Sequence, residues 1–158
     1  MIILLDIDGV LVTSPPWKKV ETGEDGFMLF NKSSAENLSA ILLETNASVV
    51  LTTTHRISHS IEKWLRIFKA RGLNIDVLSK INNVGSIAEM KDRGSEIKEW
   101  VDINGLEQNY VIIDDDSSLN NLPSYIKNKW VVTKPFVGID DEVKQKALNI
   151  LLKKYRGL

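Results

Sequence analysis

Cysteine is absent from this chain of 158 residues, which excludes disulfides, thiolate catalysis and thiolate zinc sites. An excess of one charge is also missing, because 20 basic residues face 21 acidic ones and the formal net charge is −1. A global basic field for binding nucleic acid is therefore excluded, although a local basic patch is not. No apolar run approaches the roughly 20 residues that a membrane span needs. Asp6 and Asp8 interrupt the apolar N-terminus where a signal peptide requires an unbroken core, so we expect a cytoplasmic protein with no membrane partner.

The bulk composition is that of an ordinary globular protein. Hydrophobic residues make up 43% of the chain and charged residues 26%. The length is that of one domain with one well-buried core. We therefore expect residues 1–158 to form a single domain.

Two carboxylates stand at the end of the first apolar run, which covers residues 2–7. This run is short, β-branched and continuous, which predicts a buried parallel strand. Asp6 and Asp8 then lie at the carboxyl edge of a sheet, where open α/β sheets bind ligands. Because two such charges repel each other and resist burial, a cation is their natural partner. The run thus predicts a metal site and a nucleophile.

Strands and helices alternate along the rest of the chain. Further strands are predicted at residues 47–51, 75–78, 110–113 and 130–132, and helices from residue 33 or 34, over 58–71, over 95–103 and over 140–155. The first of these helices opens with a Ser-Ser-Ala-Glu sequence that fits a capping box. The pattern predicts an α/β fold of three α/β/α layers around a five-stranded, mostly parallel sheet. Residues 13–31 are predicted to be a long irregular connection, and such connections tend to be functional or mobile.

Polar side chains also follow two other strands. Thr52 comes after the second strand, and Asp114 and Asp115 come after the fourth. Because parallel strands end at one edge of the sheet, these groups are expected to converge with Asp6. Oxygen ligands of this kind suit Mg²⁺, and a threonine hydroxyl suits a phosphate oxygen.

The sequence leaves three assignments within this group of polar residues open. Thr53 and Thr54 blur the register at the end of the second strand, where we favour Thr52 over Thr53. A cation for the phosphate is offered by Arg93 first, Lys91 second, and Lys98. Asp116 or Ser117 is expected to cap the next helical turn, which leaves Asp114 and Asp115 for the metal.

These residues resemble the haloacid dehalogenase (HAD) superfamily of phosphatases. The four HAD motifs are an Asp-x-Asp-Gly strand end, a threonine or serine strand end, a lysine or arginine, and an acidic pair, and all four occur here in that order. Three further segments are similar to small HAD domains linked to nucleic-acid end repair: Leu51-Thr52-Thr53-Thr54-His55-Arg56, Arg93-Gly94-x-Glu96-Ile97-x-x-Trp100 and Val137-Gly138-Ile139. His55 stands where that subgroup usually has tryptophan.

The resemblance implies a magnesium-dependent phosphohydrolase and a role for each motif. Asp6 would form an aspartyl-phosphate, and Asp8 would act as general acid and base. Gly9 would allow the turn that aims both carboxylates at the phosphate. Phosphate would be held by Gly9, Thr52 or Thr53, and Arg93 or Lys91, and Mg²⁺ would be held by Asp6, Asp8, Asp114 and Asp115.

Other interpretations remain beside this one. A receiver-like phosphoacceptor domain shares the fold class, but its acceptor aspartate would follow the third strand, where this chain has Ser79 and Lys80. A non-catalytic phosphate- or magnesium-binding module is a second alternative. The substrate is a small phosphate ester or a nucleic-acid end, and the resemblance favours the latter.

Several side chains near the predicted site have two open interpretations. His55 and Arg56 either contact substrate or pair with the acidic edge. The resemblance implies that residues 13–31 form a small flap. Trp17, Phe27 and Phe30, in or beside it, either close over substrate or anchor the loop.

Overall fold

A computed structural model describes residues 1–82, 86–105 and 107–153. Its centre is a five-stranded sheet in the order β3-β2-β1-β4-β5, and every neighbouring pair is parallel. The strands are β1 (Ile2–Leu5), β2 (Ser48–Leu51), β3 (Leu78–Lys80), β4 (Tyr110–Asp114) and β5 (Trp130–Val132). The α/β class and the parallel sheet predicted from the sequence are confirmed. The chain order reverses at β1, which lies between β2 and β4, so the carboxyl end of β1 is the switch point where ligands of such sheets bind.

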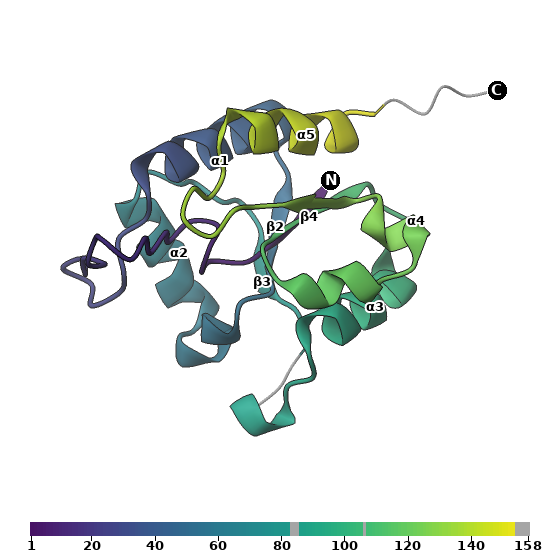
Figure 1. The fold of residues 1–158 in the computed structure, drawn as a ribbon, viewed down its shortest axis with the longest axis horizontal. Helices are drawn as coiled ribbons and strands as arrows, with labels where there is room; N and C mark the ends of the chain where they lie inside the picture. Colours follow the sequence, from purple (N-terminus) through teal and green to yellow (C-terminus); the bar gives the residue numbers. More distant parts are fainter. Residues whose placement is uncertain (83–85, 106, 154–158) are drawn as a thin grey trace.

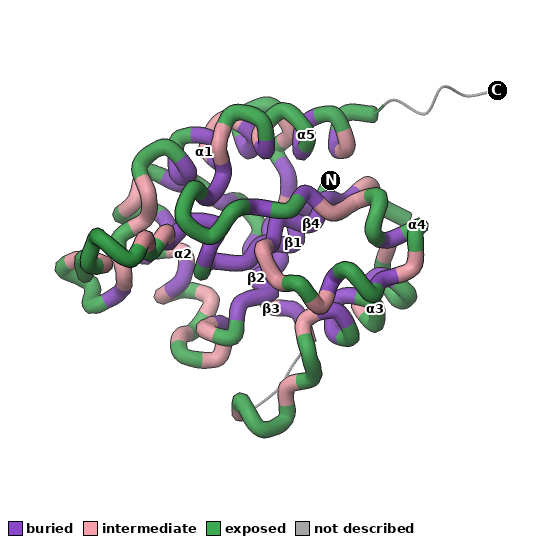
Figure 2. Tube along the Cα trace, in the orientation of Figure 1, coloured by how far each residue is buried: buried purple, intermediate pink, exposed green. Residues whose placement is uncertain are grey.

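Helices cover both faces of the sheet (Figure 1). On one face lie α1 (Lys32–Thr45), α2 (Ile61–Ala70) and α5 (Asp141–Leu151), whose apolar side chains join those of alternate strand residues in one core cluster. On the other face lie α3 (Arg93–Asn104), the 3₁₀ turn η3 (Ser117–Asn121) and α4 (Ser124–Lys127), which close a second cluster. The three central strands, β1, β2 and β4, are almost wholly buried between these layers (Figure 2). This explains why their sequences are continuous apolar runs rather than alternating ones.

Local structure differs from the sequence prediction in the starts and ends of elements. The third strand was predicted at 75–78, but β3 begins only at Leu78 because Val77 is exposed and the ladder with β2 pairs Val49 with Leu78. The helix predicted over 58–71 is shorter, because α2 begins only after its N-cap Ser60, and a 3₁₀ turn η1 (Thr54–Ser58) precedes it. Another short 3₁₀ turn, η2, covers Ile87–Glu89.

The cap of the first helix was predicted wrongly. The side chain of Asn31, rather than a serine, accepts the hydrogen bond from the Ser34 amide. The Ser34 hydroxyl instead accepts from the backbone amide of Ile139, more than a hundred residues away. A serine near a helix start can satisfy a distant amide as well as a local one, and the sequence does not distinguish the two. The closing helix ends at Leu151, and the last part of its predicted range, 154–155, lies outside the described residues.

Candidate active site

The period of the strands determines which polar side chains meet at the carboxyl edge. In β1, Ile2 and Leu4 belong to the cluster beneath α3, while Ile3 and Leu5 belong to the opposite one. Asp6 therefore continues the row that faces α3. By the same alternation Asp114, the last residue of β4, follows Ile112 on the α3 side. Thr52 follows Val50 in the same row of β2.

Arg93 is the first residue of α3 and supplies the positive charge at this edge. Its Nη1 lies 3.2 Å from Oδ1 of Asp6 and 2.7 Å from Oδ2 of Asp114. The helix starts two residues earlier than predicted because Asp92 caps it, accepting a hydrogen bond from the Ser95 amide. Gly94 lets the start of α3 approach η3, since a Cβ at this position would lie 3.0 Å from the carbonyl oxygen of Ser118. The N-terminus of α3 thus positions Arg93 at the carboxyl ends of the strands.

Three carboxylates converge beside this guanidinium. Asp6, Asp114 and Asp115 each place an oxygen within 4.8 Å of the others, and Asp6 and Asp114 are buried. Gly9 leaves the space for Asp115, because a Cβ there would lie 2.1 Å from Oδ2 of Asp115. Gly9 also has a φ of 76°, a left-handed conformation that glycine adopts without strain.

The electrostatics of this cluster are those of a site for a cation. Burial and the neighbouring charge of Asp114 raise the pKa of Asp6 well above its ordinary value, and burial and Asp114 likewise raise the pKa of Asp115. Burial opposes the charge on Arg93, but the carboxylates of Asp6 and Asp114 outweigh it and raise the pKa of Arg93. One guanidinium thus faces three carboxylates. These oxygen ligands and the uncompensated negative charge fit a hard divalent cation.

Asp8 differs from the buried acids because its side chain is 58% exposed. It sits in a tight turn, in which the Gly9 amide donates to the carbonyl of Val12. Its Oδ2 lies 2.8 Å from Nε2 of His55, in the 3₁₀ turn after β2. Of the two sequence interpretations of His55, the structure shows the contact with the acidic edge. Asp8 is therefore held at the surface of the site, where solvent can exchange protons with it.

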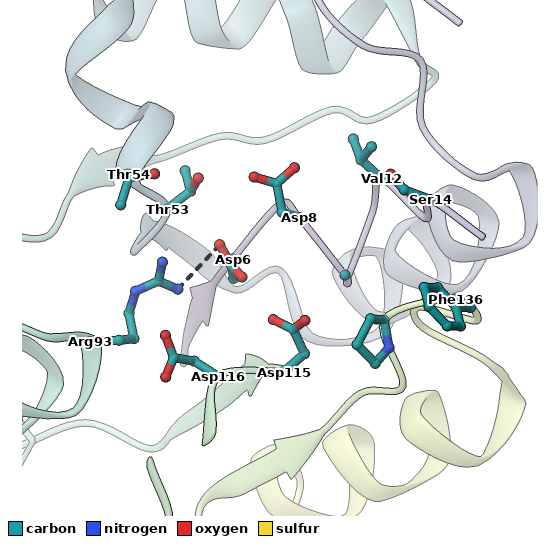
Figure 3. Close-up of a pocket in the computed structure, with 12 residues that line it drawn as sticks. Asp6, Asp8, Val12, Ser14, Thr53, Thr54, Arg93, Asp115, Asp116 and Phe136 are labelled. Atoms are coloured by element: carbon teal, nitrogen blue, oxygen red, sulfur yellow. Dashed lines mark ion pairs between the residues drawn. The ribbon is translucent and has the colours of Figure 1, made fainter. Parts of the chain in front are cut away.

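A cavity of about 390 Å³ opens above these groups. It is lined by Asp6, Asp8, Gly9, Val12, Ser14, Thr53, Thr54, Arg93, Asp115, Asp116, Pro135 and Phe136. Figure 3 shows Asp6 in its centre, Arg93 facing it, and Asp115 approaching from the β4 end. The charged groups form the floor of the cavity and Phe136 lies at one side. The cavity thus joins one arginine to an acidic cluster that could hold a metal ion.

Comparison with known families agrees with this geometry. Residues 2–143 match the family described as the HAD domain in Swiss Army Knife RNA repair proteins. The chain belongs to this family. HAD domains are mostly phosphohydrolases, and the Asp6, Asp114 and Asp115 cluster lies where the HAD motifs meet. The chain matches none of the curated proteins searched. Among the described helices of this HAD domain, none is long and apolar enough to cross a membrane.

The three basic residues that the sequence offers for binding phosphate have different ion-pair partners. Arg93 reaches the acidic cluster, whereas Lys91 pairs with Glu99 at 3.1 Å and Lys98 pairs with Asp102 at 2.6 Å. Both lysines thus form ion pairs within or beside α3, away from the cavity lining. The structure therefore brings only one of the three candidates to the cavity.

Arg56 does not reach the cavity either, because its side chain is 1% exposed. It donates to Oε2 of Glu96 at 2.5 Å and to the backbone carbonyls of Ile81, Thr52 and Thr53. The interpretation of Arg56 as a substrate contact does not fit this position. Arg56 instead fastens the ends of β2 and β3 to α3.

The two threonines after β2, Thr52 and Thr53, also differ in their positions relative to the cavity. Thr52 is fully buried, and its hydroxyl is the buried side-chain polar atom without a hydrogen-bond partner in the described part of the chain. Thr53 lines the cavity, and its hydroxyl accepts a hydrogen bond from the His55 amide. Asp116 caps η3, accepting from the Ser118 amide, as predicted.

Several residues of the site were not found from the sequence, among them Val12, Ser14 and Pro135 of the cavity lining. Two others lie in the segment after β5. Thr133 follows β5 and is buried, and its hydroxyl donates to the carbonyl oxygen of Gly9 at 2.8 Å, which holds the turn after β1. Phe136, a little further on, lines the cavity. The strand-end argument used for Asp6 and Asp114 applies equally to the fifth strand and would have pointed to this segment.

Proposed function

We propose that this HAD domain is a magnesium-dependent phosphomonoesterase that acts on phosphorylated RNA ends through an aspartyl-phosphate on Asp6. The observation that carries the proposal is the position of Asp6, in the floor of an open cavity beside Arg93 and within 4.8 Å of Asp114 and Asp115. A carboxylate held between a cation and an acidic metal site is suited to attack phosphorus. The RNA end is proposed from the family, whose printed description concerns RNA repair proteins.

In the first step, a carboxylate oxygen of Asp6 bonds to phosphorus and the bond from phosphorus to the leaving oxygen breaks. Asp8 gives its proton to that oxygen, which leaves as the alcohol of the nucleotide. In the second step, Asp8 takes a proton from water, the water oxygen bonds to phosphorus, and Asp6 is released with inorganic phosphate. The exposed position of Asp8 and its contact with His55 suit this exchange of protons.

The charge of the transferring phosphoryl group is met by groups in the cavity floor. Arg93 is the proposed phosphate-binding cation, and the Thr53 and Gly9 segments line the same cavity. Mg²⁺, held by Asp6, Asp114, Asp115 and the Asp8 segment, would supply further charge neutralisation when bound. The hydroxyl of Thr52, buried without a partner, is a second candidate donor to phosphate.

We further propose that residues 1–158 act as one domain in the cytoplasm and that residues 13–31 form a flap beside the cavity. This segment contains no helix and no strand apart from an isolated bridge between Thr22 and Met28. Most of it is exposed (Figure 2). An open cavity beside such a segment suits a long substrate that enters by its end.

The test is phosphate release from phosphorylated oligoribonucleotides and from glycerol phosphate, with and without Mg²⁺, by the wild-type protein and by Asp6→Asn. We expect Asp6→Asn to lower kcat by at least about 10³-fold, because a nearly isosteric amide cannot form the intermediate. A chelator should abolish turnover, and Mg²⁺ should restore it. A thermal melt of Asp6→Asn controls for folding.

Two results would contradict the proposal. Turnover retained in Asp6→Asn would exclude the aspartyl-phosphate route. No turnover by the wild-type protein on any phosphate ester, together with retained Mg²⁺ binding measured by titration, would favour the non-catalytic binding module.

A further inference from the structure

Two aromatic residues of the flap, Phe27 and Trp17, differ in burial. Phe27 is buried, and its ring meets those of His55, His59 and Trp64 at centroid distances of 5.6, 6.1 and 5.2 Å. Trp17, by contrast, is 82% exposed. Phe27 therefore fixes the segment to the protein, and burial does not account for Trp17.

The aromatic partner of Trp17 within the described residues is Phe136. The two ring centroids are 6.4 Å apart, at an interplanar angle of 60°. Phe136 is itself 52% exposed and lines the phosphate cavity. Segments from opposite ends of the chain thus build one aromatic surface, and Phe136 connects it to the cavity that holds Asp6. Figure 3 shows Phe136 at the side of this cavity.

The flap is held firmly enough to position such a surface. Arg71, at the end of α2, donates to both carboxylate oxygens of Asp25, at 2.6 and 3.0 Å, and to the carbonyls of Phe27 and Met28. Its guanidinium also lies over the ring of Phe30, 5.0 Å from the centroid. These contacts hold residues 25–30 of the flap in place without a substrate, and Trp17 contacts Phe136 in the same state. A partner surface that is already ordered lowers the entropy cost of binding.

The charges beside the aromatic pair suit a polyanion. Lys18 and Lys19 follow Trp17, and Lys134 precedes Phe136 by two residues; all three are exposed. Within the described part of the chain, none of the three forms an ion pair. Exposed aromatic rings interleaved with free cations are the means by which proteins bind single-stranded nucleic acid.

We infer that Trp17 and Phe136 form a stacking platform for the nucleobase at the phosphorylated end of an RNA strand. This inference rests on the proposed function, because it takes the phosphate in the cavity as the end of that strand. The terminal phosphate lies at Asp6, its own base stacks on Trp17, and Lys18, Lys19 and Lys134 lie along the backbone that follows. The platform gives affinity for any base, because every base has a stacking face.

The test compares two phosphorylated oligoribonucleotides that differ only at the terminal nucleotide, which carries a base in one and is abasic in the other. The readout is the ratio of their kcat/KM values, measured for phosphate at the 3′ end and at the 5′ end. We expect a ratio of about 5- to 150-fold for the wild-type protein at the end that it accepts. Trp17→Ala should bring the ratio towards one, and Trp17→Phe should retain part of it.

Tyr125→Ala is the matched control, because Tyr125 is also an exposed aromatic residue, at 55%, but bonds to Asp102 near the far end of α3. Its ratio should equal that of the wild type. Since Trp17 is exposed, its replacement removes no core contact, and the ratio within one variant cancels any general loss of activity.

A second readout does not need turnover. The protein has four tryptophans, so the fluorescence of Trp17 must be separated from that of the other three. It is obtained by subtracting the emission of Asp6→Asn/Trp17→Phe from the emission of Asp6→Asn. We expect this emission to fall on titration with the oligonucleotide that carries the terminal base, and to fall less with the abasic one.

The outcomes separate the two proposals. Turnover with a ratio near one, and no quenching of Trp17, would overturn the platform and leave the phosphatase standing. Absence of turnover would overturn the proposed function, and the quenching result alone would then support or overturn the platform.

Discussion

Two arginines, both surrounded by acidic or carbonyl oxygens, lie on the same side of the sheet and do different things. Arg56 is 1% exposed and is bonded to Glu96 and to three backbone carbonyls. Arg93 is 10% exposed, and its contacts with described residues run through Nη1 alone, to Asp6 and Asp114. The first guanidinium is satisfied by the fold. The second lines a cavity and is left with donors for a ligand, so the contrast lies in the partners and not in burial alone.

The contrast teaches how to separate structural from functional charges. A buried arginine whose three side-chain nitrogens all have partners stabilises only the arrangement it belongs to, whereas one that shares a single nitrogen between two acids keeps donors available for a ligand. Substitutions of these two arginines test the difference, with separate expected effects on stability and on activity. A third substitution, at the Asp25 partner of Arg71, extends the comparison to a pair nearer the surface.

The largest effect is expected from Arg56→Met. Glu96 is buried, at 2% exposure, so loss of Arg56 leaves its charge without a counter-ion and removes a side-chain donor from three carbonyls. The Asn82 amide still donates to Glu96, and the backbone amide of residue 56 still donates to the Thr53 carbonyl. We expect the free energy of unfolding to fall by about 3–5 kcal/mol, measured by urea denaturation. Arg56→Lys, which keeps the charge, should cost less and remain folded for assay. The activity of the folded fraction should stay close to that of the wild type.

A matching Glu96→Gln variant and the double variant complete a cycle that isolates the coupling of the pair. A stability loss below about 1 kcal/mol for Arg56→Met, or a selective loss of kcat with unchanged stability, would remove the distinction between the two arginines.

The second effect is expected from Arg93→Lys. Lysine keeps the positive charge between Asp6 and Asp114 but loses the planar fork that contacts both an acid and a phosphate. We expect kcat/KM to fall by about 10²-fold, with little change in the melting temperature. Lys98→Ala and Lys91→Ala are the controls, since both lysines are more than 45% exposed in pairs outside the cavity. Activity reduced equally in Lys98→Ala would contradict the assignment of Arg93 as the phosphate-binding cation.

The smallest effect concerns a third arginine, Arg71, which holds the flap at the surface. Its hydrogen bonds with Asp25 lower the pKa of that carboxyl from 3.8 to about 2. The ionised pair therefore stabilises the fold above the ordinary pKa, and this contribution is lost as pH falls towards about 2. Asp25→Asn should lower the melting temperature at neutral pH by about 2–4 °C, equivalent to about 1 kcal/mol.

The gap between wild type and Asp25→Asn should narrow as the melts are repeated from about pH 6 to about pH 3. A gap that is constant with pH would show that Asp25 contributes through packing or neutral hydrogen bonds instead. This pair is partly exposed, at 26% for the Asp25 side chain, so its effect is also expected to weaken in high salt.

The sequence by itself determined the sheet and the convergence of its strand ends. Continuous β-branched runs can be buried only between two helical layers, and parallel strands must end at one edge. Asp6, Asp114 and Asp115 could therefore be placed together, and the order of the motifs indicated the HAD family that the chain belongs to. These predictions rest on periodicity and chain direction, which are local properties of the sequence.

Only the tertiary structure decided which cation, which threonine and which aromatic reach the cavity. Lys91, Arg93 and Lys98 lie in one short segment of the sequence, and what separates them is the start of α3 and its approach to η3 at Gly94. Arg56, a charged residue, is buried, and Trp17, a large aromatic residue, is exposed, and local sequence predicts neither position. A long side chain takes its partners from whichever segments pack beside it, and those segments are distant in the sequence, so local pattern does not determine its role.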